Sequence, residues 1–528
     1  MRPFDRPGRS PVIAENGMAA TSHPLATATA VAVLKEGGNA VDAAIAASAT
    51  LVVVEPHMTG IGGDCFAIVA EPDGSIHGLN GSGRAPRRAE AARYRALGHR
   101  SVPEFGPLSI TVPGAIKAWE TLLDRFGTLG FDRLFADAIR YAEEGFAVHA
   151  RVASDWARVA PRLAADEGGR KNFLVAGEVP RHGSRFRAPA LAATLRAIAA
   201  GGAKAFYEGA LAAEMAATVR AQGGFLGEDD LAAVTADWVK PISVDYRGHH
   251  VLEIPPSGQG ITALILFNLL DRLGAQALPP DSAERWHLEM EAGRLAFSVR
   301  DHLVADPATM TVTPAELLSP AFTERLAAGF DPARRNPDIR LPAVPRADTI
   351  YLTVVDRERR AVSFINSVYD SFGSGVVTPN SAIALQNRGA CFSLAEGHPN
   401  ELGPGKRPMH TIIPAMTTRR GQAAIAFGVM GGDYQPMGHA HVLSNMLDHG
   451  MDPQAAIDHP RLFWGDDGVL EAEAGIDPGI RAALAAKGHA VRDAERPHGG
   501  GQAIVIDRDS GFLIAGSDPR KDGMALGW

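Results

Sequence analysis

The feature of this sequence that most constrains the fold is a change from helical to strand-like residue patterns at Asp348-Thr349. Before it, helical patterns dominate, including a long one over residues 281–304, and residues 328–347 form a linker-like stretch rich in proline, arginine and aspartate. After it, residues 349–356 and 361–370 are rich in the β-branched and aromatic side chains typical of strands. Helices first and paired strands later predict an α+β fold in which sheet packs between helices.

Thr349 gains a chemical role if the peptide bond after Asp348 is cut. An N-terminal threonine carries a hydroxyl nucleophile and an α-amine with a pKa of about 8, which can accept the hydroxyl proton. Ser367 lies on the next predicted strand, a hairpin partner from which its hydroxyl can hydrogen-bond the amine or hydroxyl of Thr349. Further on, a predicted strand ends at Gly431-Gly432 before a helix, and backbone N–H groups there can stabilise an oxyanion.

Composition restricts the class of protein. Of 528 residues, 46% are hydrophobic and 21% are charged, and the net charge of −8 is spread along the chain, which argues against nucleic-acid and membrane-surface partners. The N-terminal stretch lacks the apolar run of a secretory signal, and no apolar run reaches the roughly 18 residues of a spanning helix. Cys65 and Cys391 are too few for a disulfide framework. We therefore expect a cytoplasmic protein that needs no cofactor.

Several motifs, in one order, resemble the γ-glutamyltranspeptidase family. They are GGNAVDAAIA (37–46), TGIGGDCF (59–66), VPG (112–114), PPSGQG (255–260), SFGSG (371–375), GPGKRP (403–408) and VMGGD (429–433). The resemblance covers nearly the whole chain and implies an N-terminal-nucleophile hydrolase with a four-layer αββα core. It also implies a precursor that cuts itself into residues 1–348 and 349–528, two fragments that stay associated. A homodimer of such heterodimers is left open.

Residue by residue, the resemblance implies catalytic roles for four positions. Asp348-Thr349 is the cleavage site and Thr349 the nucleophile, while Gly431 and Gly432 form the oxyanion hole. Ser367 stands in the place of a family threonine that supports the nucleophile. The implied reaction has two steps: Thr349 attacks an amide carbonyl and the amine departs, and then water or another amine resolves the ester.

The groups with which the family holds the α-carboxylate and α-amine of a γ-glutamyl substrate are replaced in this chain. Cys391 stands in the place of an aspartate, Tyr369 in that of an asparagine, and His410-Thr411 in that of a serine pair. Arg84 lies two residues beyond the position of the family's arginine. A thiol is mostly protonated at neutral pH, so Cys391 does not suit an ammonium group.

The remaining polar groups, Arg84, His410 and Thr411, suit an acidic acyl group instead. This pattern resembles the oxamate amidohydrolase-like branch of the family, so we expect hydrolysis of a small, oxamate-like acidic amide as the substrate class. γ-Glutamyl transfer or glutathione hydrolysis is the first alternative, and a cephalosporin-type acylase is the second.

Other classes of function fit the sequence less well. His439 and His441 fall about 200° apart on a helix, so they could not share a metal ion there. The chain contains no GxSxG, GxxxxGK[ST] or GxGxxG motif. A non-catalytic binding relative is the alternative from another class, but such a protein needs neither Thr349 nor the two glycines.

We expect the purified protein to run on a denaturing gel as two bands of 348 and 180 residues, because an active precursor cuts itself before Thr349. The Thr349→Ala variant should run as one band of 528 residues, since it lacks the attacking hydroxyl. A wild-type chain that stays uncut would contradict the catalytic assignment and favour the binding relative.

Overall fold

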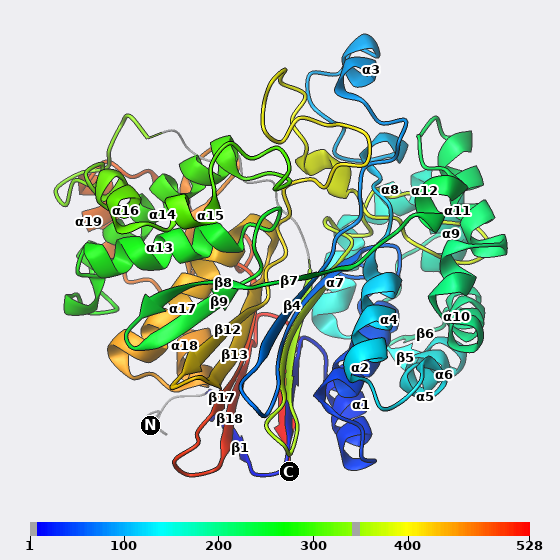
Figure 1. Ribbon diagram of the computed structural model, residues 1–528, viewed down its shortest axis with the longest axis horizontal. Coiled ribbons are helices and arrows are strands. Elements are labelled where there is room, and N and C mark those ends of the chain that lie inside the picture. The colour runs from blue at the N-terminus through cyan, green and yellow to red at the C-terminus, as the bar shows by residue number, and fades with distance from the viewer. Residues whose placement is uncertain (1–7, 340–348) are drawn as a thin grey trace.

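Two large β-sheets stack face to face in the middle of the molecule, and helices cover the outer face of each (Figure 1). The computed structural model describes residues 8–339 and 349–528. The α+β fold with four αββα layers that the sequence predicted is thereby confirmed.

Both sheets are antiparallel and have seven strands. The first sheet is formed, in spatial order, by β1 (Val12–Ala14), β18 (Leu513–Ser517), β17 (Gly500–Ile506), β13 (Gln422–Met430), β12 (Ala415–Arg419), β9 (His249–Glu253) and β8 (Ile242–Tyr246). The second is formed by β19 (Met524–Gly527), β2 (Met18–Thr21), β10 (Ile350–Val355), β11 (Ala361–Ser367), β3 (Asp64–Ala70), β4 (Ile76–Gly81) and β7 (Asp237–Val239). Two smaller sheets consist of β14 (Leu462–Trp464), β15 (Leu470–Ala472) and β16 (Val491–Asp493), and of β5 (Phe146–Ala147) and β6 (Arg185–Phe186).

Each large sheet combines strands from both sides of Thr349. The predicted hairpin is present as β10 and β11, which pair with Leu352 opposite Phe364. β10 also pairs with β2, and β11 with β3, both from the first part of the chain. A cut before Thr349 would therefore leave two fragments joined by continuous hydrogen-bonded sheets.

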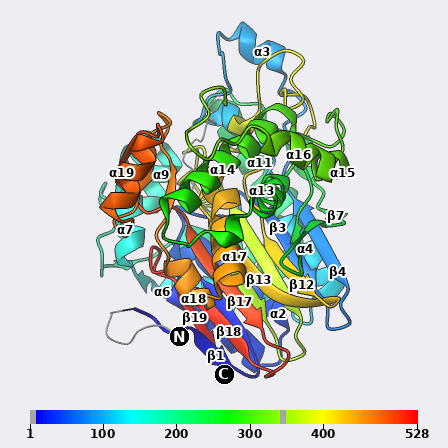
Figure 2. The ribbon, with the colours of Figure 1, turned by 90° about the vertical axis from the view of Figure 1, so that its left-hand side faces the viewer.

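The helices form the two outer layers. One group lies beside the second sheet: α1 (Pro24–Lys35), α2 (Ala40–Val54), α4 (Ala115–Phe126), α5 (Phe131–Leu134), α6 (Ala136–Glu144), α7 (Ala150–Arg158), α8 (Ala160–Ala165), α9 (Glu167–Phe173), α10 (Pro189–Tyr207), α11 (Ala210–Ala221) and α12 (Glu228–Ala232). The other lies beside the first sheet, as Figure 2 shows face on: α13 (Gly260–Arg272), α14 (Ala283–Leu303), α15 (Pro314–Leu317), α16 (Pro320–Ala327), α17 (Gln435–His449), α18 (Pro453–Asp458) and α19 (Pro478–Ala486).

The remaining helical elements are short. They are α3 (Ala91–Ala96), at the end of the molecule drawn at the top of Figure 1, and the 3₁₀ turns η1 (Pro107–Ser109), η2 (Ala275–Ala277), η3 (Arg388–Cys391) and η4 (Gly432–Tyr434). Across residues 8–339 and 349–528, no helix has the length and apolar character needed to cross a membrane.

The alternation of side chains along β10 sets which residues face the other sheet. The ring of Tyr351 lies against Gly428 of β13, where a Cβ would come within 2.4 Å of the ring carbon Cε2. Thr349 precedes Tyr351 by two residues, so it points to the same side of its sheet. The face of β10 that meets the first sheet therefore begins with the predicted nucleophile.

Gly428→Ala should destabilise the protein by about 1–3 kcal/mol, because the added methyl group overpacks the contact between the sheets. The ring of Tyr351 cannot easily move aside, since it is fully buried and its hydroxyl lies 2.7 Å from Oγ of Ser363. Urea unfolding measures the change. Gly403→Ala is the control, because the nearest atom to a Cβ there is Cδ of Lys406 at 4.0 Å. Equal stability of the two variants would contradict the prediction.

Candidate functional site

Thr349 is buried at the start of β10, beside the serine that the sequence placed with it. Its Oγ1 lies 3.1 Å from Oγ of Ser367 on the opposite strand. Ser367 Oγ also accepts the backbone N–H of Tyr369 at 2.8 Å. Asp348, the other half of the predicted cleavage site, lies outside the described residues.

Three predicted substrate-binding residues meet at a residue that the sequence reading missed, Arg388. Its Nη1 donates to Oγ1 of Thr411 at 2.7 Å and lies 3.9 Å from Sγ of Cys391. The guanidinium carbon lies 4.2 Å from the centre of the Tyr369 ring, a cation–π contact. The signal that could have revealed Arg388 is its position as the lone charge in the otherwise uncharged stretch 382–392.

The guanidinium of Arg388 is buried but only partly hydrogen-bonded. Nε and Nη2 have no hydrogen-bond partner among the described residues. Leaving such groups unpaired in the interior is costly, at about 1–3 kcal/mol for each neutral group and more for charged ones. Two free N–H groups on one guanidinium match the two oxygens of a carboxylate.

The thiol and the phenol beside Arg388 are uncharged at neutral pH. Burial raises the pKa of the Cys391 thiol, although Arg388 opposes the shift, and burial raises the pKa of Tyr369 as well. Tyr369 also has a φ of +79°, an unfavourable backbone conformation for a residue with a side chain. The pair can therefore donate or accept hydrogen bonds, but neither side chain supplies a negative charge.

His410 is turned towards the protein rather than towards the nucleophile. Its Nδ1 accepts the N–H of Ile412 at 3.3 Å, so Nε2 carries the proton that it donates to Asp64 at 3.0 Å. The Asp64 contact has the distance of an ion pair, but burial, helped by the charge of Arg388, lowers the pKa of His410 to about 3. The ring is therefore neutral, and both of its nitrogens are already used.

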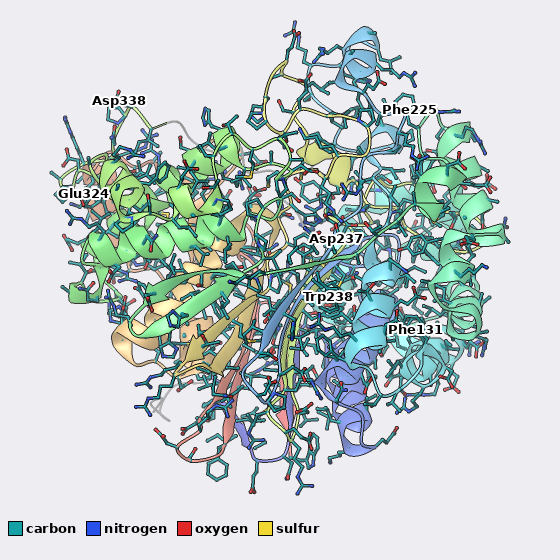
Figure 3. All side chains as sticks on the ribbon, in the orientation of Figure 1. Phe131, Phe225, Asp237, Trp238, Glu324 and Asp338 are labelled. Atoms are coloured by element: carbon teal, nitrogen blue, oxygen red, sulfur yellow. The ribbon has the colours of Figure 1, made fainter. Side chains whose placement is uncertain are left out.

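Arg84, the arginine that the sequence offered as a carboxylate clamp, already has partners of its own. It donates to the carbonyl of Gly405 at 3.1 Å and lies 3.6 Å from Asp237 and 3.9 Å from Asp306. Its side chain is 41% exposed, and it lines a cavity of about 240 Å³. Figure 3 labels Asp237, where β7 begins. A clamp role for Arg84 stays a prediction.

The two glycines form the turn between β13 and α17. Gly431 and Gly432 have φ values of +122° and +57°, which favour glycine. A Cβ on Gly431 would lie 2.7 Å from Cα of Gly499, so this turn also depends on a close backbone approach. The carbonyl of Gly432 accepts Nε2 of Gln259 at 3.1 Å, and the same nitrogen donates to the carbonyl of Thr411 at 2.7 Å.

Two cavities border this turn or the residue that follows it. The larger, of about 530 Å³, is lined by Gly431 and Asp433, and the smaller, of about 280 Å³, by Tyr369, Cys391 and Asp433. Asp433 is the one residue common to both linings. The smaller cavity is lined by two of the predicted substrate-binding side chains, Tyr369 and Cys391, and the larger one opens beside the predicted oxyanion hole.

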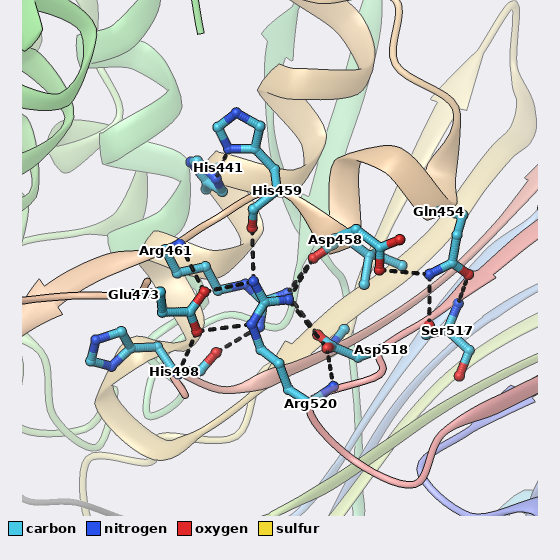
Figure 4. Close-up of polar contacts among 12 residues, drawn as sticks. His441, Gln454, Asp458, His459, Arg461, Glu473, His498, Ser517, Asp518 and Arg520 are labelled. Atoms are coloured by element: carbon cyan, nitrogen blue, oxygen red, sulfur yellow. Dashed lines mark hydrogen bonds and ion pairs between the residues drawn. The ribbon is translucent and has the colours of Figure 1, made fainter. Parts of the chain in front are cut away.

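A buried polar network holds the wall of the larger cavity in place (Figure 4). Arg461 donates to the carbonyl of His498 at 2.6 Å and to Asp518 at 2.7 Å, and Glu473 accepts the backbone N–H of His498 at 3.0 Å. Arg520 pairs with Glu473 at 2.6 Å. These contacts fix His498, and therefore the neighbouring Gly499, against the glycine turn.

The described residues contain no group of three or more histidine, cysteine or acidic side chains placed to hold a metal ion. His439 and His441 point from α17 to different partners, Glu253 at 2.8 Å and Glu289 at 3.1 Å.

The amino-acid sequence of this chain is similar to those of known proteins. The sequence model of the Gamma-glutamyltranspeptidase family matches residues 26–528. The chain is 37% identical over 532 residues to the oxamate amidohydrolase proenzyme of Klebsiella pneumoniae, with 98% of this chain and 99% of that protein covered. It is 36% identical over 531 residues to the glutathione hydrolase-like YwrD proenzyme of Bacillus subtilis, with the same coverage.

A solved structure gives the same picture of the fold. The cephalosporin acylase from Bacillus halodurans superposes with a TM-score of 0.93 at 40% identity, covering 100% of this chain and 99% of that one. By their names, two of these three relatives are hydrolases and the third is an acylase, and the named substrates differ.

Stability should fall as the pH drops from about 6.5 towards 3, because buried His410 stays neutral in the folded chain while it binds a proton when unfolded. His23, His439 and His489, whose pKa values burial also lowers to about 3, should add to the loss. Each contributes about 1.4 kcal/mol per pH unit within that window.

Urea unfolding of the Thr349→Ala chain at several pH values measures this dependence. Adding His410→Gln, which keeps a donor for Asp64 but cannot titrate, should reduce the slope by about 1.4 kcal/mol per pH unit. An unchanged slope would contradict the assignment of a neutral His410.

Proposed function

This chain belongs to the γ-glutamyltranspeptidase family, whose members act on amide bonds, and from that premise we propose that it is a self-cleaving amidohydrolase for small amides that carry a carboxylate, of the oxamate type. Thr349 is the nucleophile, and the acyl group lies in the smaller cavity. The observation that carries the proposal is Arg388, a buried arginine whose Nε and Nη2 are unpaired among the described residues and which contacts Tyr369 and Cys391, two side chains that line the smaller cavity.

The side chains in direct contact with Arg388 favour an acidic acyl group. Thr411, Cys391 and Tyr369 surround the guanidinium without adding a negative charge. A carboxylate bound to Nε and Nη2 would supply the missing partner through two parallel, charge-assisted hydrogen bonds. The oxamate amidohydrolase relative supports the same substrate class.

Cys391, in the place of the family's aspartate, is poorly suited to the α-amine of a γ-glutamyl group, and Asp301 and Asp433 are carboxylates that line the smaller cavity. The neutral thiol of Cys391 stands where a carboxylate would pair with an ammonium, and the next cationic group, Arg388, lies 3.9 Å from its sulfur. Placing an ammonium beside this guanidinium costs free energy through like-charge repulsion. Glutathione hydrolysis is for this reason a weaker hypothesis than hydrolysis of a small acidic amide.

The catalytic sequence follows from the residues around Thr349. After cleavage, its α-amine takes the proton of Oγ1, which Ser367 orients from 3.1 Å. Oγ1 attacks the amide carbonyl, whose oxygen is stabilised by backbone N–H groups at Gly431-Gly432. Loss of one such donor typically costs about 2.7–4 kcal/mol of barrier. Water then hydrolyses the ester, and the two fragments remain together through their shared sheets.

A second candidate is an acylase that releases a larger amine. The cavity of about 530 Å³ beside Gly431 favours it, because its lining includes Gly431 but neither Tyr369 nor Cys391 of the smaller cavity. The likeness to the cephalosporin acylase of Bacillus halodurans supports the same reading.

A panel of amides separates these functions, with ammonia or amine release as the measurement. We expect turnover of oxamate and other short amide acids, weak turnover of γ-glutamyl-p-nitroanilide, and no turnover of neutral amides of the same length. A preference for glutaryl amides of large amines would favour the acylase, and a preference for the γ-glutamyl compound would overturn the proposal.

Within that panel, Arg388→Met should lower kcat/KM for acidic amides about a hundredfold or more, since it removes the charge that pairs with the carboxylate. Arg388→Lys should recover part of this loss. Arg84→Ala is the matched control, because it removes an arginine that already has two carboxylate partners. If kcat/KM for acidic amides fell in Arg84→Ala but not in Arg388→Met, the carboxylate-binding residue would be Arg84 instead. Each variant should still cut itself, which the gel reports as evidence of folding.

A further inference from the structure

Asp433 has a buried carboxylate oxygen that nothing in the described structure pairs. Its Oδ1 accepts Nη1 of Arg300, a guanidinium that Asp301 and Gln259 also hold. Its Oδ2 has no hydrogen-bond partner among the described residues, although the side chain is only 3% exposed. Since buried polar atoms are almost always paired, an unpaired oxygen that borders a cavity marks a place for a ligand donor.

The position of Asp433 decides which part of a substrate that donor belongs to. It follows Gly432 directly in the chain and is the residue that the two cavities share. If the carbonyl oxygen of the amide lies at the glycine N–H groups, the amide nitrogen lies about 2.3 Å from that oxygen, as bond lengths and angles require. The side chain one residue beyond the glycines is then within reach of the nitrogen, at the boundary between the acyl side and the amine side.

We propose that Oδ2 of Asp433 accepts an N–H of the departing nitrogen, and that this contact makes the site selective for amides over esters. This inference rests on the proposed function, because it takes Thr349 as the nucleophile and Gly431-Gly432 as the oxyanion hole. Arg300 acts as a positioning residue: it binds Oδ1 and so turns Oδ2 towards the cavities.

The step conserves atoms and charge. A bond forms between Oγ1 of Thr349 and the carbonyl carbon, the carbon–nitrogen bond breaks, and the hydroxyl proton ends on the departing nitrogen. For a primary amide, ammonia leaves with three N–H bonds, one of which points at the carboxylate. An ester places an oxygen without a proton at this position, so it gains nothing from Asp433. Addition of water to the acyl ester releases the acid and restores the threonine hydroxyl.

The test compares an amide with the ethyl ester of the same acid, oxamate and ethyl hydrogen oxalate, on the self-cleaved enzyme. Asp433→Asn should lower the ratio of kcat/KM for the amide to that for the ester about ten- to hundredfold, the value of a hydrogen bond to a charged group. The ester rate itself should change little. Asp301→Asn is the matched control, because it removes the other carboxylate on Arg300 and should leave the ratio unchanged.

Two results would overturn the proposal. Equal losses on amide and ester would mean that Asp433 supports the glycine turn or the amine of Thr349, and unchanged rates on both would mean that it contacts no reacting group. If the wild-type enzyme accepts neither oxalyl compound, the proposed function fails instead. The same ratio is then measured with the amide and ester of whichever acid in the panel the enzyme accepts, so that the two failures remain distinguishable.

Discussion

The site depends on the close stacking of β10 on β13, where the ring of Tyr351 lies against Gly428. Thr349 stands two residues before this contact and Gly431 three residues after it, so one packing contact anchors both the proposed nucleophile and the proposed oxyanion hole. A continuous series of contacts then joins them. Thr349 contacts Ser367, which contacts Tyr369, and the ring of Tyr369 lies against Arg388. Arg388 binds Thr411, and Gln259 donates to the carbonyls of both Thr411 and Gly432. Because interiors are densely packed, a shift at one member is transmitted to the others.

A second feature of the site is that some of its buried polar atoms have no hydrogen-bond partner among the described residues. Some buried charges of this protein have a partner for every polar atom, as Asp518, Arg520 and Glu473 do. Arg388 and Asp433 differ, since each has one set of atoms held by the protein and another without a described partner. The held atoms fix the orientation of the side chain, and in the proposed function the unpaired ones bind the substrate. These polar atoms lose their contacts with water when the protein folds, so the free-energy cost of desolvating them is not repeated when the substrate binds. The site is preorganised in this sense.

Much of this arrangement was visible in the amino-acid order. The strand pattern after residue 348 predicted the β10–β11 hairpin, and hairpin pairing alone brings Thr349 beside Ser367, because opposite residues of neighbouring strands lie about 5 Å apart. The motifs around Gly431-Gly432 indicated a glycine turn before a helix, as the structure has it. Local signals of this kind survive because they depend on backbone conformation and on residues close in sequence. Arg388 was overlooked, since a lone arginine in an uncharged stretch is ordinarily a surface residue.

The sequence by itself determined the α+β layers, the hairpin that holds the threonine, the glycine turn and the membership of a family of amide-cleaving proteins. Only the tertiary structure decided which polar side chains are free for a substrate. His410 and Arg84 carry suitable chemistry, but Asp64 engages the first, and Asp237 and Asp306 lie beside the second. Those partners come from segments more than 150 residues away in the chain. Whether a polar atom is satisfied depends on such distant neighbours, and no local pattern of residues records them.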